Sequence, residues 1–427
     1  MGMKAYPTYK DSGIDWLGEV PQHWEKYRTP SILKVISKAG TDSDELLSVY
    51  LDRGVIRHSD SGGMQVHKPS KDMSAYQKVL PGNFVCNNQQ AWRGSVGVSE
   101  YEGRISPAYI IFKLSSKLVP QFANYFFRSQ AWNPSFVYSS KGVGSIQRNL
   151  YLPWLRQHYC YLPTTEEQQS IVAYLDKKCA EIDELVTRRQ AIIERLKELK
   201  QSIIADAVTK GLNPDVPMMD SGIDWLGEVP QHWEKYRTPS ILKVTSKAGT
   251  DSDELLSVYL DRGVIRHSES DGMQVHKPSK DMSSYQKVLP GNFVCNNQQA
   301  WRGSVGVSEH EGRISPAYII FNLSSKLVPK FANYFFRSQA WNPSFVYSSK
   351  GVGSIQRNLY LPWLRQHYCY LPSTEEQQAI VAYLDKKCAE IDELVVRQEQ
   401  IIEKLKELKT ATIAHVVTGK VDVRDAI

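Results

Sequence analysis

Apolar residues recur in steps of three, four or seven along two long stretches of the chain, which is the spacing of one face of an α-helix. In the first stretch they are Ile171, Leu175, Ile182, Leu185, Ile192, Leu196, Leu199 and Ile203. In the second they are Ile380, Leu384, Ile391, Leu394, Ile401, Leu405 and Leu408. A long helix with one apolar stripe is unstable alone in water, so we expect the two stripes to bury each other as a coiled coil.

Start and stop signals bound both helices. The first is expected to begin at Thr164 or Thr165, with Glu167 or Gln168 closing a capping box, and to end at Gly211. The second is expected to run from Ser373 or Thr374 to Gly419. A helix of about 44 residues is about 65 Å long at about 1.5 Å per residue.

The connection between the helices predicts their relative direction. The linker from Asn213 to Asp220 is too short to return along the first helix, even fully extended. A second domain must therefore sit near the far end of the first helix, and the second helix is free to run back. We expect an antiparallel pair whose flanking domains are related by an approximate two-fold axis.

The chain contains a long internal repeat. Asp11 to Pro21 (DSGIDWLGEVP) recurs letter for letter from Asp220 to Pro230, at an offset of 209. Between Asp11 and Pro163 there are seven differences from the second copy: Ile36/Thr245, Asp60/Glu269, Gly62/Asp271, Ala75/Ser284, Tyr101/His310, Lys113/Asn322 and Gln121/Lys330. A repeat of this length is a whole domain plus a helix, not a solenoid unit.

Within each copy the pattern is mixed. Strands are expected at Leu46–Leu51, Phe84–Asn87, Ala108–Leu114 and Gln157–Leu162, a short helix at Gln121–Ser129, and loops at Ser61–Gly63, Arg93–Ser95 and Lys141–Ser145. The fold class is α+β, with two globular domains joined by two long helices. We expect recognition domains at residues 1–163 and 213–372, and spacer helices at 164–212 and 373–427.

The composition is that of an ordinary folded protein. The 427 residues are 41% hydrophobic, yet no apolar run approaches the roughly 20 residues of a membrane span. Met1 to Lys10 has no apolar core of a secretory signal. We therefore expect a cytoplasmic protein that does not contact a membrane. Its cysteines, none in a C-x-x-C pair, are expected to be reduced and mostly buried: Cys86, Cys160, Cys179, Cys295, Cys369 and Cys388.

The charge is unevenly divided. Residues 11–163 hold 17 Lys/Arg against 12 Asp/Glu, and residues 220–372 hold 17 against 13. The helical stretches 164–212 and 373–427 are negative, with 8 against 9 and 8 against 11. Positive domains on near-neutral helices favour a protein that grips two separate segments of a polyanion such as DNA.

Three segments resemble the specificity subunits of type I restriction-modification enzymes. Asp11 to Trp24 (DSGIDWLGEVPQHW) is similar to the family's N-terminal segment, and Lys141 to Val172 to its junction between domain and helix. Asn88 to Gly94, followed by Ser106 to Tyr109, is similar to one subgroup of its recognition domains. These segments recur in the second half, so the resemblance covers nearly the whole chain. The near-identity of the two halves departs from the family, whose members usually carry two different recognition domains.

The resemblance implies a DNA-binding, non-catalytic subunit. It implies double-stranded DNA, two methyltransferase subunits and, through the complex, restriction subunits as partners. S-adenosylmethionine, ATP and Mg²⁺ would then be bound by those partners, and no cofactor or metal by this chain.

Base reading needs Arg or Lys for guanine and Asn or Gln for adenine, on segments that reach a groove. Each candidate could equally serve the structure of a hairpin. Trp92 and Trp301 are expected in the core. The first-half candidates are Arg57, His58, Asn87, Asn88, Gln89, Gln90, Arg93, Lys141, Arg148 and Asn149. The second-half candidates are Arg266, His267, Asn296, Asn297, Gln298, Gln299, Arg302, Lys350, Arg357 and Asn358.

An adenine methyltransferase acting alone is the main alternative. Asn133-Pro134-Ser135-Phe136 and its copy at Asn342 to Phe345 resemble the Asn-Pro-Pro-Tyr/Phe tetrad that holds a flipped adenine. The third position is Ser, and no Gly-rich cofactor turn precedes it, so we interpret both as Asn-Pro turns. Lys141-Gly142-Val143-Gly144 likewise lacks the later residues of a phosphate-binding loop.

Two further alternatives remain. A nuclease could use His58 and His67 with Asp52, Asp60 and Asp72, although scattered His and Asp are usually solvated side chains. A scaffold that binds only proteins would use the coiled coil alone, and the basic domains disfavour it.

Overall fold

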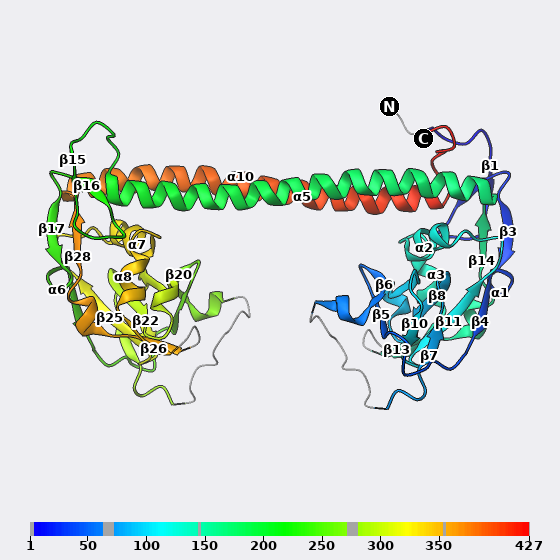
Figure 1. The fold of residues 1–427 in the computed structure, drawn as a ribbon, viewed down its shortest axis with the longest axis horizontal. Coiled ribbons are helices and arrows are strands. Elements are labelled where there is room, and N and C mark those ends of the chain that lie inside the picture. Colours follow the sequence, from blue (N-terminus) through cyan, green and yellow to red (C-terminus); the bar gives the residue numbers. More distant parts are fainter. Residues whose placement is uncertain (1–3, 63–71, 144–146, 271–280, 353–355, 427) are drawn as a thin grey trace. The chain divides into compact units, whose positions relative to one another are not determined.

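The structure is a computed structural model that describes residues 4–62, 72–143, 147–270, 281–352 and 356–426. It forms two compact units, one of residues 1–190 with 400–427 and one of residues 191–399. The same elements follow in the same order in both units (Figure 1).

The first unit carries short strands and helices, and two long helices run into both units. Its strands are β1 (Tyr9–Asp11), β2 (Glu19–Pro21), β3 (Glu25–Arg28), β4 (Leu33–Ile36), β5 (Leu47–Tyr50), β6 (Gly54–Arg57), β7 (Gln77–Val79), β8 (Asn83–Asn87), β9 (Val96–Val98), β10 (Gly103–Ile105), β11 (Tyr109–Leu114), β12 (Ser140–Val143), β13 (Gln147–Leu150) and β14 (Tyr159–Leu162). Its short helices are α1 (Thr29–Ile32), α2 (Pro120–Arg128), α3 (Asn133–Tyr138) and α4 (Leu152–Leu155), with 3-10 turns η1 (His58–Ser61) and η2 (Ala91–Arg93). The long helices are α5 (Thr165–Lys210) and α10 (Thr374–Val417).

The second unit repeats this set. Its strands are β15 (Met218–Asp220), β16 (Glu228–Pro230), β17 (Glu234–Arg237), β18 (Leu242–Thr245), β19 (Leu256–Tyr259), β20 (Gly263–Arg266), β21 (Gln286–Val288), β22 (Asn292–Asn296), β23 (Val305–Val307), β24 (Gly312–Ile314), β25 (Tyr318–Leu323), β26 (Ser349–Val352), β27 (Gln356–Leu359) and β28 (Tyr368–Leu371). Its short helices are α6 (Thr238–Ile241), α7 (Pro329–Arg337), α8 (Asn342–Tyr347) and α9 (Leu361–Leu364), with η3 (His267–Glu269) and η4 (Ala300–Arg302).

An antiparallel four-stranded sheet organises each unit, in the order β4-β11-β8-β9 in the first and β18-β25-β22-β23 in the second. Side chains alternate between its faces, as a strand's period of two requires. Phe84 and Cys86 of β8 face a large aromatic core, whereas Val85 faces a smaller core under the β5–β6 hairpin. The expected strands and the short helix are confirmed, and the class is α+β.

The large core of the first unit lies between the sheet, helices α2 and α3, and the ends of both long helices. Phe122 and Phe126 of α2 are buried there with Ile171 near the start of α5 and Val416 near the end of α10. In the second unit Val208, near the end of α5, lies in the corresponding core. The last turns of α5 therefore pack into the core of the second unit.

The long helices begin where the sequence predicts, but the capping box does not form. Thr164 caps α5, because its Oγ1 accepts the backbone N–H of Glu167 at 3.3 Å. The Glu167 carboxylate instead accepts the indole N–H of Trp24 at 3.1 Å and the hydroxyl of Tyr6 at 2.6 Å. The Gln168 side chain accepts the N–H of Val119 and donates to two backbone carbonyls. The junction motif therefore fastens the helix to the globular domain.

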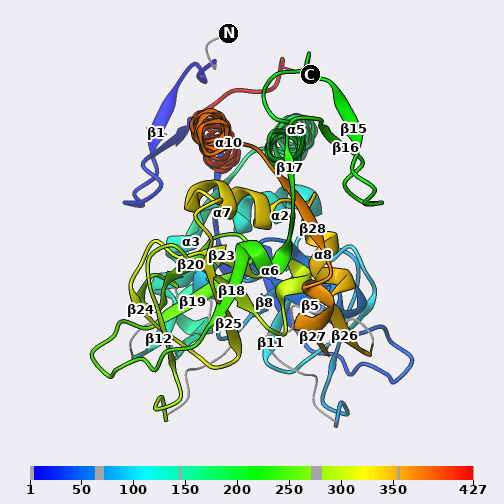
Figure 2. The same ribbon diagram turned by 90° about the vertical axis from the view of Figure 1, so that its left-hand side faces the viewer.

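Within each unit the long helices run antiparallel and side by side (Figures 1 and 2). In the first unit Lys409 donates to Asp183 at 2.7 Å, and in the second Lys200 donates to Asp392 at 2.7 Å. The expected antiparallel pairing is confirmed.

The buried seam differs from the predicted stripe. Ile182 is 7% exposed, but Leu185, Ile192 and Leu199 are 41%, 37% and 50% exposed. Ile193, at 7% exposed, takes the place that the stripe assigned to Ile192. A seven-residue repeat drifts around a helix with about 3.6 residues per turn, so the row at 185, 192 and 199 turns away from the partner.

The six cysteines are free and buried, as predicted. In the part of the chain that the structure describes, no helix is long and apolar enough to cross a membrane.

Candidate nucleic-acid interface

The loop after β8, at Asn87–Arg93, carries half of the base-reading residues predicted for the first unit, and hydrogen bonds hold it in a defined turn. The side-chain oxygen of Asn87 accepts the N–H of Gln89 at 3.0 Å, which forms an Asx turn. The chain then enters η2, which ends at Gly94 with a φ of 94°, a conformation that favours glycine. Ser95 donates to the carbonyl of Val49 at 3.3 Å and so ties the loop to β5.

Asn88 differs from its neighbours in the loop. Its backbone N–H donates to Ala108, and its carbonyl accepts the N–H of Leu150 at 2.9 Å. Its side-chain oxygen is buried and accepts no hydrogen bond from the described residues. Through its backbone, Asn88 therefore links the loop to the segments that carry Ala108 and Leu150. Its neighbours differ, because Gln89 is exposed and Gln90 is half-buried.

The segment from Lys141 to Asn149 is a β-hairpin rather than the predicted loop. Strand β12 pairs with β13, and Lys141 lies opposite Asn149. Gly144 and Ser145 lie outside the described residues. The ammonium of Lys141 lies 5.6 Å from the centre of the Tyr151 ring, within reach of a cation–π contact. Two paired strands supply the backbone hydrogen bonds that a glycine-rich segment lacks as a free loop.

Trp92 connects the loop to this hairpin, and the prediction that it lies in the core is wrong. The ring is half-buried and lies outside the core cluster that holds its neighbour Ala91. The guanidinium of Arg93 lies 4.8 Å from the ring centre, and that of Arg148 on β13 lies 5.2 Å from it. The indole N–H donates to the carbonyl of Gln89 at 3.1 Å.

Arg57 and His58 stand at the end of β6. The Arg57 side chain pairs with Glu45 at 3.2 Å and lies 4.9 Å from the centre of the Tyr101 ring. The His58 ring shares a hydrogen bond of 3.2 Å with the hydroxyl of Ser48. His58, but not Arg57, belongs to the same hollow as the loop after β8.

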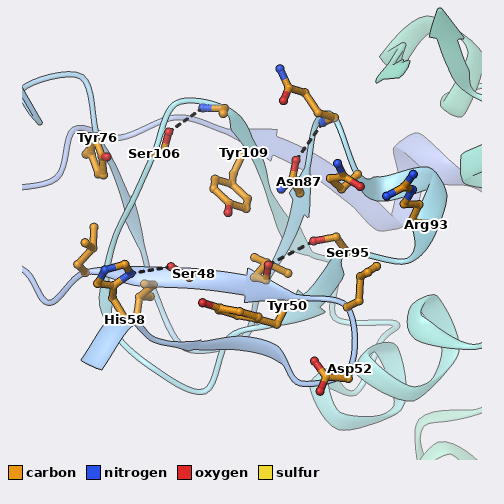
Figure 3. A pocket seen from close by; sticks show the side chains of 17 residues that line it. Ser48, Tyr50, Asp52, His58, Tyr76, Asn87, Arg93, Ser95, Ser106 and Tyr109 are labelled. Carbon is orange, nitrogen blue, oxygen red and sulfur yellow. Dashed lines mark hydrogen bonds between the residues drawn. The ribbon is translucent and has the colours of Figure 1, made fainter. Parts of the chain in front are cut away.

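That hollow is a pocket of about 640 Å³ between the loop and the β5–β6 hairpin. Figure 3 shows the Tyr109 ring between the segment that carries Asn87 and Arg93 and the strand that carries Ser48 and Tyr50. Burial raises the pKa of Tyr109, so its phenol stays neutral near pH 7. Five predicted residues line this pocket: His58, Asn87, Gln89, Gln90 and Arg93.

Sequence reasoning missed several residues of the pocket. Tyr50 and Tyr76 line it, as does Asp52, which the sequence offered only as a nuclease candidate. Arg128 of α2 contacts the backbone of Asp52. Arg128 donates to the carbonyl of Asp52 at 2.6 Å, and burial lowers its pKa. Tyr109 had a signal, because it ends one of the segments that resemble recognition domains. No sequence signal pointed to Arg128, because it lies 76 residues from its partner Asp52.

The second unit repeats these contacts with two differences, both at Arg266, and one is that His310 stands where Tyr101 contacts Arg57 in the first unit. Arg266 pairs with Glu254 at 3.0 Å and also with Glu269 at 3.6 Å, where the first unit has Asp60. The other contacts match: His267 with Ser257, the Asx turn of Asn296 with Gln298, the carbonyl of Asn297 with Leu359, Arg302 and Arg357 over Trp301, Lys350 over Tyr360, and Lys350 opposite Asn358. Gln299 precedes η4 as Gln90 precedes η2.

The structure bears on the methyltransferase alternative. Asn133 to Tyr138 is the helix α3 and not the predicted turn, because Pro134 is favourable in the first turn of a helix. Phe136 is 0% exposed in the aromatic core, where it cannot stack on an extruded base.

The nuclease alternative has no metal-binding cluster in the described part of the chain. There, no three His, Cys, Asp or Glu side chains are grouped to hold an ion. His67 lies outside the described residues.

Comparisons with known proteins agree with this architecture. No model of a known protein family matches the sequence. A chain from a solved structure of a type I restriction-modification system is similar in fold, with a TM-score of 0.63 at 15% identity, over 93% of this chain and 98% of that one. Two α+β domains joined by paired long helices are thus the class of fold.

Curated relatives make the resemblance specific. A Methanocaldococcus jannaschii protein, provisionally named the type I restriction enzyme MjaX specificity subunit, is 21% identical over 96% of both chains. The type I restriction enzyme EcoBI specificity subunit of Escherichia coli is 23% identical over 61% of this chain and 57% of its own length. The predicted resemblance to type I specificity subunits is confirmed.

Proposed function

We propose that this chain is the DNA-recognising specificity subunit of a type I restriction-modification complex. The observation that carries the proposal is the same set of amide and guanidinium side chains in both units. It accompanies similarity to a protein named as a specificity subunit along 96% of the chain. Such a subunit works where the chromosome is, in the cytoplasm of a bacterial or archaeal cell.

The proposed partners supply the chemistry. Two methyltransferase subunits that bind S-adenosylmethionine would methylate adenine in each half of a split site, and restriction subunits would use ATP and Mg²⁺. The burial of Phe136 supports a non-catalytic role for this chain. The purified chain is expected to show no methyltransferase, nuclease or ATPase activity. Methyl transfer by the pure chain above background would contradict this role.

Base reading is assigned to the loop and backbone positioning to the hairpin. Gln89 and Gln90 offer amides that suit adenine, and Arg93 offers a guanidinium that suits guanine. Removing one of these contacts should weaken binding by about 1–3 kcal/mol and relax choice at one position. Lys141 is assigned to a phosphate, so Lys141→Ala should weaken all DNA equally and reduce the salt slope by about one.

The target is expected to be a gapped palindrome. Identical readers on antiparallel helices would meet the duplex with opposite strand polarity, as the halves of dimeric DNA-binding proteins do. None of the seven differences falls in the loop at Asn87–Arg93 or in the hairpin. Two of them, Tyr101/His310 and Asp60/Glu269, change the contacts of Arg57 and Arg266. If the two half-sites differ, we therefore expect the difference at the base nearest Arg57 in one half-site and nearest Arg266 in the other.

Mapping modified adenines tests the proposal. The chain would be expressed with its methyltransferase subunits, and methylated positions in plasmid DNA would be sequenced. We expect two short inverted half-sites separated by a fixed gap, and no methylation when this chain is omitted. Methylation that does not depend on the chain would refute the proposed function.

A double substitution tests the loop itself. Gln89→Ala with Gln298→Ala should relax one base in each half-site. The exposed Gln121 on α2 provides a control, because Gln121→Ala should leave the map unchanged. An unchanged map and affinity for the double variant would contradict the assignment of the loop.

A further inference from the structure

In both units one tryptophan ring holds two arginines from different segments. Arg93 belongs to the loop after β8 and Arg148 to the hairpin, and their guanidinium carbons lie 4.8 and 5.2 Å from the centre of the Trp92 ring. In the second unit the corresponding distances to Trp301 are 4.7 and 5.2 Å. The same arrangement is therefore present in both units, whose sequences are identical in these segments.

The tryptophan is hydrogen-bonded to the loop, and the loop is hydrogen-bonded to the hairpin. Its N–H donates to the backbone of Gln89 at 3.1 Å. The hydrogen bond from Leu150 to Asn88, at 2.9 Å, ties the hairpin to the same loop. The second unit repeats both bonds, at 3.0 and 2.9 Å. Because these hydrogen bonds hold the ring and the two segments in place, the ring can order the flexible side chains of Arg93 and Arg148.

A guanidinium that lies over an aromatic ring can retain its recognition chemistry. Contact with an aromatic ring uses the flat face of the group, whereas its five N–H donors point outward in its plane. An arginine edge pairs with O6 and N7 of guanine through two parallel hydrogen bonds, which is the commonest specific contact to DNA. Ordering the side chain before DNA arrives removes part of the entropy loss on binding.

We propose that Trp92 and Trp301 are positioning residues that hold Arg93 with Arg148, and Arg302 with Arg357, for recognition of guanine in each half-site. The inference rests on the proposed function and extends it, because it adds Arg148 and Arg357 to the guanine contact and gives each tryptophan the role of positioning the arginines. Arg93 also lines the pocket that holds Gln89 and Gln90, so the guanine lies next to the bases that these amides read.

The test uses the whole chain assembled with its methyltransferase subunits. Trp92→Leu with Trp301→Leu removes both rings, Trp92→Phe with Trp301→Phe keeps an aromatic face, and Arg93→Lys with Arg302→Lys keeps the charge without the two-pronged edge. The control pair is Trp16→Leu with Trp225→Leu, since both residues are half-buried and stack on tyrosines that belong to neither the loop nor the hairpin. Each variant is measured for its methylation map, its affinity at several salt concentrations and its thermal unfolding.

We expect the leucine and lysine pairs to lose about tenfold in discrimination at guanine positions and to keep their adenine positions, as for one specific contact. The phenylalanine pair should recover most of that loss, and the control should match the parent. Equal weakening on all DNA with an unchanged base preference would show phosphate contacts and overturn the inference. So would half-sites that contain no guanine, or lower thermal stability without altered preference. A parent complex that methylates without sequence choice would instead refute the proposed function.

Discussion

The buried seam of the long helices can be tested with a matched pair of alanine substitutions one turn apart. Ile182 is 7% exposed and Leu185 is 41% exposed, although the apolar pattern places both on one stripe. Either substitution removes three carbon atoms, each contributing about 0.8 kcal/mol when fully buried. Scaled by burial, the transfer free energy lost is about 2.2 kcal/mol for Ile182→Ala and at most about 1.4 kcal/mol for Leu185→Ala.

Two further effects widen the gap. A cavity left in the seam brings the cost of Ile182→Ala to about 2–4 kcal/mol. Alanine has the highest helix propensity, so the cost of Leu185→Ala falls to about 1 kcal/mol. Urea unfolding followed by far-UV circular dichroism measures both. The repeat provides a replicate, since Ile391 is 6% exposed and Leu394 is 41% exposed. Equal losses for the two members of a pair would show that the stripe read from the sequence, and not the seam described above, is buried.

Three other predictions concern the domain junction, pH and the helices. Gly419→Ala should destabilise the chain more than Gly13→Ala, which should cost about 1 kcal/mol. Both glycines have positive φ, but a Cβ at Gly419 would lie 2.4 Å from Pro21 and one at Gly13 would meet nothing within 4 Å; equal thermal shifts would contradict this. Burial lowers the pKa of His158 and His367, so the unfolded chain binds protons more readily and stability should fall as pH drops through about 6.5. Replacing both by Gln should flatten that part of the pH–stability curve, and an unchanged curve would rule these groups out. Deleting Ile192–Glu198 with Ile401–Glu407 removes one heptad from each helix and should change the gap between half-sites. A methylation map with altered half-sites and the old gap would refute the spacer role.

Sequence alone was sufficient wherever the signal is local or depends only on chain length. The period of the apolar residues predicted α5 and α10, and Thr164 and Gly211 stand at the expected ends of the first helix. The short linker predicted antiparallel pairing, because a chain cannot reach farther than its extended length. The repeat predicted two equivalent units. The candidate loop could also be found from sequence, since Asn, Gln and Arg are the side chains with donors and acceptors that match base edges.

Tertiary structure decided what depends on contacts between distant segments. An apolar stripe is wider than a seam, so only the partner helix determined that Ile182 is buried and Leu185 is not. Pairing with β13 made Lys141 part of a strand. Tryptophan is usually a core residue, yet the contact of Trp92 with Arg148 depends on a hairpin strand that lies more than 50 residues further along the chain. Periodicity describes the side chains of one element, whereas burial and stacking depend on the elements that pack against it.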